Sequence, residues 1–556
     1  MLTEYTTPGA SVEVRDDESI YSLLTERIKR TGEDTVIAER KTAPGQWTKV
    51  TTGEFHKNVL SAAKGLIAFG IAKGDAVTLF STTRYEWGVL DFALAAIGAV
   101  NVPIYDTDSA AQAERILNDS NVKLAIADDR ERFDRLDSVI DHCPSLKHIL
   151  MLDANAMGAL EGLGVTVSDE ELDARIKSVR ADDLATIVYT SGSTGAPKGA
   201  ELSHRNFVSI TRAGSLALHE MILEDHPRLL LFLPLAHCFA RFIQYASIAS
   251  DDGVVGYLPD TKTLLPDVRS FEPTYLLGVP RVFEKVYNAA SRKAGMGWKG
   301  RLFLKAAESA RDWSRMQQAG EKPTMKQTAE HLSYEASVYH TVRGALGPRI
   351  RYVACGGAPL DVSLAHFFNG IGLPMIQGYG MTETAAPFTV TRVNDNKIGT
   401  VGQPAPGSSV RIADDGEVQV RGANVFFVGF SSFTKQAAAG IRALAPAVIC
   451  VGCLSAFRGY AQGHGNMTPT AVSQILEALC KLVIGLGLAY WLVRAGQPSH
   501  VAAAGAITGV TVGTILALAY MIFNFVSTRM REEKDTQDAP DSARRILSTL
   551  MKIAIP

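Results

Sequence analysis

The chain has 556 residues, of which 21% are charged and 46% are hydrophobic, and its formal net charge is -2. This length predicts three or four domains, and the lack of a basic excess excludes nucleic acid as an expected partner. Six cysteines are too few for a disulfide framework. The N-terminal stretch lacks the charged and apolar regions of a secretory signal, so we expect the first half to begin in the cytoplasm.

The pattern up to about residue 425 predicts an α/β fold with large open sheets. The stretch "HKNVLSAAKGLIAFGIAKGDAVTLFS" (56–81) reads as a helix, a glycine stop and a strand, and residues 84–105 repeat this order. A hydrophilic insert at 315–335 predicts a helical excursion on the surface. Further on, "SSVRIADDGEVQVRG" (408–422) predicts a hairpin, because Asp415-Gly416 lies between two alternating strands.

A strand at 184–190 leads into a loop whose composition suits a polyphosphate. Glycines let backbone N–H groups turn inward, hydroxyls add donors, and a lysine adds positive charge. After the loop, Ser203 is expected to cap a helix. The spacing differs from Walker A, which disfavours a P-loop NTPase, and a flexible Ser/Gly linker is the other reading. Thr190 ends the strand, and the loop residues are Ser191, Gly192, Ser193, Thr194, Gly195, Ala196, Pro197, Lys198 and Gly199.

Four further stretches follow in order: "LPLAHCFARF" (233–242), "GVPRVFEKVY" (278–287), "YVACGGAPL" (352–360) and "IQGYGMTET" (376–384). With "YTSGSTGAPKG" (189–199), they resemble the AMP-forming acyl-CoA synthetases of the adenylate-forming superfamily, and most of all the bacterial long-chain fatty acid ligases. The resemblance covers residues from about 15 to 425. It implies stacked α/β sheets with a small β subdomain, and it implies fatty acid, ATP and CoA as substrates with Mg²⁺ as cofactor.

The resemblance also implies roles for individual residues. The loop would hold the β- and γ-phosphates, His237 would lie beside the acyl carboxylate and the α-phosphate, and Tyr379 would stack on adenine. Catalytic roles would fall to His237, Thr382, Glu383 and Lys198. Mg²⁺ would be held by Thr194 and Glu383, as suits a hard cation. The nucleotide would further contact Gly356, Gly357, Ala358, Pro359, Gln377, Gly378, Gly380 and Met381, and the acyl chain would be bordered by His237, Gly278, Val279, Pro280 and Arg281.

The family pattern stops after the predicted hairpin. The resemblance implies a ribose-binding aspartate, a hinge and a lid domain with a lysine, yet neither a "TGD" nor a "GR-x-K" stretch occurs after Gly422. Because the lid completes both half-reactions, we expect weak ATP binding and very slow turnover.

The composition changes beyond a junction at 426–436. Only five of the 92 residues from 437 to 528 are charged, which predicts an all-α segment of about three transmembrane helices near 437–457, 471–493 and 501–526. Glu477 and Lys481, at i and i+4, are expected to pair on one face. Cys450 and Cys453 lie in an apolar run, so we prefer helix packing over a metal site. Buried helices of a soluble domain remain the alternative.

The last part of the chain has its own resemblance. Residues from about 427 onward are similar to a fragment of a polysaccharide and lipid flippase of the multidrug/oligosaccharidyl-lipid/polysaccharide exporter superfamily. A charged tail, 529–556, is expected to be cytoplasmic and truncated. Three readings follow: a multi-pass membrane ligase with its catalytic domain in the cytoplasm, a flippase-like component, or an inactive chimaera of two gene fragments. We choose the ligase as the function that the motifs indicate, and for the molecule itself we favour the third reading, in which neither activity is complete. The acyl chain length and the oligomeric state are not readable from the sequence.

Overall fold

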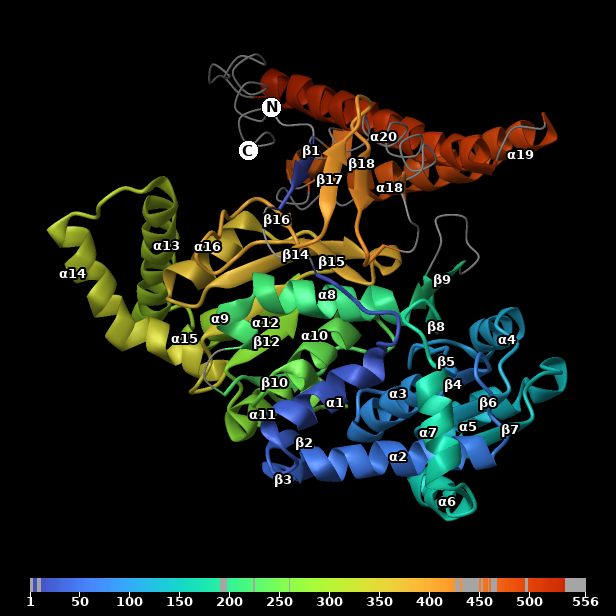
Figure 1. The fold of residues 1–556 in the computed structure, drawn as a ribbon. Helices are drawn as coiled ribbons and strands as arrows, with labels where there is room; N and C mark the ends of the chain where they lie inside the picture. Colours follow the sequence, from blue (N-terminus) through green and yellow to red (C-terminus); the bar gives the residue numbers. More distant parts are fainter. Residues whose placement is uncertain are drawn as a thin grey trace. The chain divides into compact units, whose positions relative to one another are not determined.

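The computed structural model describes residues 4–7, 12–190, 198–223, 226–259, 261–425, 431–432, 450–451, 454–458, 460–461, 468–495 and 499–535. These residues divide into two compact units, one ending at Ser431 and the other beginning at Ser432. The first unit contains three sheets and sixteen of the helices described here (Figure 1). The described residues of the second are helical apart from Ser432, which belongs to a short strand, and the turn residue Ala495. The predicted α/β class of the first part is confirmed.

A six-stranded sheet forms the part of the first unit that leads to the predicted phosphate loop. Its order is β7-β6-β4-β5-β8-β9, parallel except for the β8–β9 pair. Strands β4 and β6 are buried throughout and, apart from Thr78 in β4, apolar, as expected where both faces of a parallel sheet are covered. The strands are β4 (Ala76–Phe80), β5 (Val100–Asn101), β6 (Leu124–Ala127), β7 (His148–Met151), β8 (Leu184–Thr190) and β9 (Lys198–Ser203).

A nine-stranded sheet carries the other predicted motifs. Its order is β16-β15-β14-β13-β12-β10-β11-β2-β3, with six parallel strands from β14 to β2 and antiparallel strands at both margins. The strands are β2 (Val36–Ala43), β3 (Gln46–Thr51), β10 (Arg228–Leu231), β11 (Val254–Tyr257), β12 (Tyr275–Gly278), β13 (Tyr352–Cys355), β14 (Met375–Met381), β15 (Ala386–Val390) and β16 (Gln403–Pro404).

The small third sheet has the order β1-β17-β18-β19. Its strands are β1 (Glu4–Thr6), β17 (Ser409–Ile412), β18 (Val418–Arg421) and β19 (Ser431–Ser432). The β17–β18 pair is antiparallel, and Gly416 has a φ of 84°, a left-handed conformation that glycine adopts without strain. The hairpin predicted around Asp415-Gly416 is therefore confirmed.

The helices of the first unit cover these sheets. Several are capped by their own sequence: Thr51 and Glu54 form a capping box at α2, and Ser203 caps α8 as predicted. The predicted surface excursion at 315–335 is also helical, since it spans the end of α13 and all of α14. The helices are α1 (Ile20–Thr31), α2 (Thr52–Ala68), α3 (Tyr85–Ile97), α4 (Ala110–Asp119), α5 (Arg130–Asp137), α6 (Ala156–Gly164), α7 (Asp169–Ser178), α8 (His204–Ala217), α9 (His219–Ile222), α10 (Cys238–Ala249), α11 (Leu264–Phe271), α12 (Pro280–Ala294), α13 (Trp298–Ala319), α14 (Met325–Tyr334), α15 (His340–Ala345) and α16 (Val362–Gly370).

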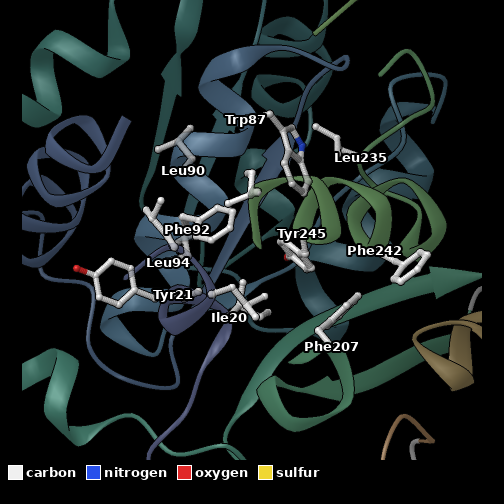
Figure 2. Packing of buried hydrophobic residues seen from close by; sticks show 14 of the residues in the cluster. Ile20, Tyr21, Trp87, Leu90, Phe92, Leu94, Phe207, Leu235, Phe242 and Tyr245 are labelled. Atoms are coloured by element: carbon white, nitrogen blue, oxygen red, sulfur yellow. The ribbon is translucent and has the colours of Figure 1, made fainter. Parts of the chain in front are cut away.

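The largest core joins α1, α3, α8 and α10, as Figure 2 shows. Tyr245 of α10 makes two edge-to-face contacts. The rings of Phe92 and Phe207 lie 5.6 and 5.4 Å from its ring, and each is nearly perpendicular to it. Such edge-to-face pairs add to the free energy gained by burial. This core fixes α10, whose N-terminal cap is the predicted site residue His237.

The second unit holds two long apolar helices. One runs continuously from 468 to 494 as α18 (Thr468–Cys480), a π-helical turn η6 (Lys481–Gly485) and α19 (Leu486–Arg494), and the other is α20 (Ser499–Asp535). The segments Thr468–Arg494 and Gly505–Ser527 are long and apolar enough to cross a membrane. Most of the expected first span, 437–457, and most of the junction 426–436 and the tail after 535 lie outside the described residues, so the number three remains a prediction.

One pairing predicted in this unit is wrong. The Glu477 carboxylate pairs with the Arg458 guanidinium at 2.9 Å, and not with Lys481. Arg458 also donates to the Ser473 hydroxyl at 2.8 Å. The planar guanidinium of an arginine has several N–H donors, so it can reach two acceptors that lie one turn apart on α18. The spacing of residues along one helix does not reveal such a partner.

A fully buried histidine in the first unit predicts a pH dependence of stability. The His204 ring accepts a hydrogen bond from the Ile20 N–H at 3.3 Å, and burial lowers the pKa of His204 to about 4. In the unfolded chain the pKa of His204 is near 6.5. Between pH 6.5 and pH 4 the unfolded chain therefore binds a proton at this residue more readily than the folded chain does. The free energy of unfolding should therefore fall as pH drops from 6.5 towards 4, by on the order of 3 kcal/mol from this group.

The variant His204→Asn keeps an acceptor for the Ile20 N–H and removes the titration. Urea midpoints at pH 7 and pH 5 should therefore differ less in the variant than in the parent chain. Equal pH dependence in the two proteins would contradict the assignment.

Candidate active site

The predicted site residues follow four neighbouring parallel strands. "PLAHCF" follows β10, "GVPR" begins at the end of β12, "GGAP" follows β13, and "QGYGMT" occupies β14 and the turn after it. These strands are parallel and stand in the order β14-β13-β12-β10, so their carboxyl ends share one edge of the sheet. Strand β11 lies on one side of β10, and the next strand along the chain, β12, lies on the other side of β10. This reversal is a switch point, where open α/β sheets bind ligands.

Direct contacts around Gly356 bring three of these stretches together. The Gly356 N–H donates to the Gly278 carbonyl at 3.3 Å. A Cβ at Gly356 would lie 2.9 Å from the Phe239 ring and 3.3 Å from the Gly378 carbonyl oxygen. Only a residue without a side chain fits between that ring and that carbonyl. The position therefore requires glycine for packing within the site edge.

His237 caps α10 and is held in one orientation. Its Nδ1 accepts a hydrogen bond from the Phe239 N–H at 3.1 Å, and burial lowers the pKa of the imidazole. A neutral imidazole that accepts through Nδ1 carries its proton on Nε2. His237 can therefore donate a hydrogen bond to an anionic oxygen without adding a positive charge.

Thr382 and Glu383 lie in the 3₁₀ turn η5 (Thr382–Thr384), next to the start of α10. The Cys238 thiol lies 3.9 Å from the Thr382 carbonyl oxygen, and burial raises the pKa of that thiol to about 12, with the Glu383 charge adding to the rise. The first turn of α10 and η5 are thus in contact. Together they bring the three predicted residues His237, Thr382 and Glu383 close to one another.

A strained residue, which sequence reasoning missed, follows this turn. Ala385 has a φ of 59°, and its N–H donates to the Thr382 carbonyl at 2.9 Å. A left-handed alanine costs on the order of 1 kcal/mol or more, and such residues gather at functional sites. The strain here fixes the direction in which the chain leaves η5.

Tyr379 is 39% exposed, and its ring lies 5.1 Å from that of Phe388 in an edge-to-face contact. It lines a hollow of about 490 Å³ with residues of β15 to β18. Packing between strands explains why glycine stands on both sides of Tyr379. A Cβ at Gly380 would lie 2.3 Å from the Ala386 carbonyl oxygen, and one at Gly378 would lie 3.1 Å from Pro387. Both glycines let β15 approach β14.

The phosphate loop is framed by a hairpin. Thr190 ends β8 and stands opposite Lys198, which begins β9 and is exposed. The expected strand 184–190 is confirmed, but the expectation that Lys198 and Gly199 belong to a loop is wrong, because 198–203 pair with β8 as a strand. The predicted residues Ser191, Gly192, Ser193, Thr194 and Gly195 lie outside the described residues, as do Ala196 and Pro197.

The predicted acyl-pocket stretch forms the start of α12. Pro280 occupies the first turn, where its missing N–H is not needed. A Cβ placed on Gly357 would lie 3.8 Å from the Val279 side chain. The Arg281 side chain is exposed. Val279 therefore faces the "GGAP" wall, whereas Arg281 points to solvent.

A buried ionic network, which sequence reasoning missed, fixes α10 against the sheet that carries the phosphate loop. Arg241 and Asp91 pair at 2.6 Å with 1% of each side chain exposed. Arg241 also donates to the Thr186 hydroxyl in β8 at 2.8 Å, and Tyr245 donates to Asp91 at 2.6 Å. The only signal in the sequence is that Arg241 lies four residues after His237 and so one turn further along α10.

Among the described residues, no group of three or more His, Cys, Asp or Glu side chains could hold a metal ion by itself. Glu383 can still supply one carboxylate to a hard cation that is otherwise held by phosphate oxygens, which is how Mg²⁺ is commonly bound. The second predicted ligand, Thr194, lies outside the described residues.

The comparison with known families decides the classification. A sequence profile described as AMP-binding enzyme matches residues 24–426. The chain belongs to this family. Its match with AMP-binding enzymes takes in all the motifs described above and ends where the composition changes.

Named relatives agree with this assignment. The long-chain-fatty-acid–CoA ligase FadD15 of Mycobacterium bovis is 43% identical over 416 residues, which are 74% of this chain and 68% of the relative. The peroxisomal long chain acyl-CoA synthetase 7 of Arabidopsis thaliana is 30% identical over 411 residues, covering 69% of this chain and 57% of the relative.

Two solved structures share the fold of this AMP-binding enzyme. A long-chain-fatty-acid-CoA ligase (FadD1) from Archaeoglobus fulgidus has a TM-score of 0.56 at 17% identity, covering 77% of this chain and 78% of that one. The N-terminal domain of FACL13 from Mycobacterium tuberculosis has a TM-score of 0.53 at 20% identity, covering 76% of this chain and 92% of that one.

Proposed function

We propose that this protein activates a long-chain fatty acid with ATP, forming an acyl-adenylate that CoA converts to acyl-CoA. The relatives named as long-chain fatty acid ligases support the substrates. The single observation that carries the mechanism is the gathering of the site motifs at the carboxyl ends of β10, β12, β13 and β14. Fatty acid, ATP and CoA are the substrates, and Mg²⁺ accompanies ATP.

In this proposal the fatty acid carboxylate attacks the α-phosphorus of ATP, and pyrophosphate leaves. Negative charge then grows on the α-phosphate oxygens, so donors fixed beforehand lower the barrier. His237 donates from Nε2 to this region, and the Thr382 hydroxyl contacts the α-phosphate. Lys198, with the loop 190–197, holds the β- and γ-phosphates. Mg²⁺, held by Glu383 and Thr194, would neutralise phosphate charge.

The other predicted residues would shape the two substrate slots. Tyr379 stacks on adenine, with Gly356, Gly357, Ala358 and Pro359 as the facing wall and with Gln377, Gly378, Gly380 and Met381 along β14. Val279 and Pro280 border the acyl chain beside Gly278 and Arg281. The exposed Arg281 then lies at the rim of the acyl slot and not inside it.

We further propose that α18, α19 and α20 enter a bilayer and hold the catalytic unit at the cytoplasmic side. Helix α20 carries Gly505, Gly509 and Gly513, and a Cβ at Gly509 would lie 2.5 Å from the Gly485 backbone. Small residues spaced by four allow such close approach between membrane helices. The relatives found are fatty acid ligases, and they give no support to the flippase-like reading of this region.

The activity is tested by incubating the full chain in detergent with ATP, Mg²⁺, palmitate and CoA. We expect palmitoyl-CoA and AMP, with no ADP. Mass spectrometry identifies both products, and omission of palmitate is the control. Thioester formation without AMP would contradict the proposal.

A further inference from the structure

The corner between α12 and α13 combines a dense positive charge with exposed apolar side chains. We define this corner as residues Arg292–Lys305. Five of its fourteen residues are basic and none is acidic: Arg292, Lys293, Lys299, Arg301 and Lys305. All five side chains are exposed. The whole chain has a formal charge of only -2, so this local excess is not a property of the overall composition.

Large apolar side chains lie among these charges and are not used by the core. Met296 is fully exposed at 100%, Trp298 at 65% and Leu304 at 58%. Met296 stands between Gly295 and Gly297 in the short connection from α12 to α13. Exposing a methionine and a tryptophan side chain so close together costs free energy on a surface that meets only water. The corner therefore has the character of a contact surface.

The start of α13 orders these groups on one side. Trp298, Arg301 and Lys305 recur at i, i+3 and i+7, whereas the buried residues Phe303 and Ala307 lie on the opposite side of the helix. The Lys299 ammonium lies 5.6 Å from the centre of the Trp298 ring. The first acidic residue on the exposed side is Glu308, where the basic surface ends. Only Gly295, Met296 and Gly297 separate the end of α12 from the start of α13.

We propose that the α12–α13 corner docks on the surface of an anionic lipid bilayer. Tryptophan favours the boundary between headgroups and acyl chains, and methionine and leucine enter the apolar layer beneath. Lysine and arginine bury their stems while their charges meet the lipid phosphates. An acidic protein would match the charges equally well, but it supplies no uniform apolar layer for three side chains that point outward from two successive turns.

The proposal goes beyond the activity proposed above and does not depend on it, because its readout is the position of one residue. Helix α12 begins at the predicted acyl border, Val279–Arg281, and ends in the corner. A ligase docked in this way would have one continuous helix between its acyl slot and the lipid surface from which a fatty acid arrives.

The test uses the full chain with Met296→Cys labelled by an environment-sensitive fluorophore. The matched control is Val165→Cys, because Val165 is 81% exposed but has acidic neighbours at Glu161, Asp169 and Glu170. The parent chain, carried through labelling, gives the background from its own cysteines. Each protein is mixed with vesicles of phosphatidylcholine alone or of equimolar phosphatidylcholine and phosphatidylglycerol.

We expect a blue shift of the emission at position 296 on the anionic vesicles only, and no shift at position 165. Adding Arg292→Glu and Arg301→Glu should abolish the shift without changing the circular dichroism spectrum. Because α18–α20 would attach the chain to either vesicle, local depth and not total binding is the measure. A label at 296 that stays in water on anionic vesicles would overturn the proposal, and it is the result expected if an acidic protein is the true partner. Equal shifts at 296 and 165 would overturn it as well.

Discussion

Replacing Thr382 by valine should lower palmitate-dependent ATP–pyrophosphate exchange by about 100-fold, since one fixed donor to developing charge is worth roughly this factor. Valine keeps the branched shape in a residue that is buried beside α10, and it removes only the hydroxyl. The loss should appear mainly in the maximal rate, because the hydroxyl is proposed to act on the α-phosphate in the transition state. The urea midpoint of the protein should change little.

The neighbouring Thr384→Val variant is the matched control. The Thr384 hydroxyl donates to the Ala386 carbonyl at 2.7 Å and accepts from the Met381 N–H at 3.1 Å. Its removal leaves buried backbone groups unpaired, which costs about 1 to 3 kcal/mol of stability. If both variants lose stability and activity together, Thr382 is only a structural residue of the turn.

Breaking the buried Arg241–Asp91 pair should cost about 3 to 5 kcal/mol of stability, because the remaining charge stays buried without a partner. Arg241 lies over three aromatic rings, with its guanidinium 5.0 Å from the centre of the Phe207 ring and 5.5 Å from that of Trp87. Figure 2 shows the three rings, those of Trp87, Phe207 and Tyr245, in the same core. The Arg241→Met variant removes the charge and keeps most of the volume. Urea unfolding in detergent, followed by tryptophan fluorescence, measures the loss.

The double variant Arg241→Met with Asp91→Asn decides whether the charge is the cause. It leaves no unpaired ion, so its loss of stability should be smaller than the sum of the two single losses. Tyr245→Phe removes two hydrogen bonds, the one that its hydroxyl donates to Asp91 and the one that it accepts from Arg241, and should cost about 1 to 3 kcal/mol. Strictly additive losses would show that packing, and not an abandoned charge, dominates at this position.

Local features of this protein were predictable because their causes are local. The turn at Asp415-Gly416 and the cap at Ser203 depend on residues within four positions, and both occur as expected. The placement of motifs after strands could also be predicted, since a hydrophobic run followed by glycines marks the end of a strand in an α/β fold.

Other features depend on residues that are far apart in the sequence. Asp91 and Arg241 are separated by 150 positions, and only the packing of α3 against α10 makes them partners. Gly380 is required by the backbone of β15, which approaches it only in the folded sheet. Strand β9 was missed because "KGAELS" has no strong strand pattern and pairs only because β8 is already in place. In each case a tertiary contact overrides the local signal.

The central claim is that the protein joins a fatty acid to AMP before CoA enters. The most direct measurement uses palmitate labelled with ¹⁸O in its carboxylate, together with ATP, Mg²⁺ and CoA. An acyl-adenylate route transfers one carboxylate oxygen to the phosphate of AMP when the CoA thiol displaces it. We predict AMP that carries one ¹⁸O in an amount equal to the palmitoyl-CoA formed. Unlabelled AMP, or ¹⁸O in inorganic phosphate with ADP as the nucleotide product, would contradict this account.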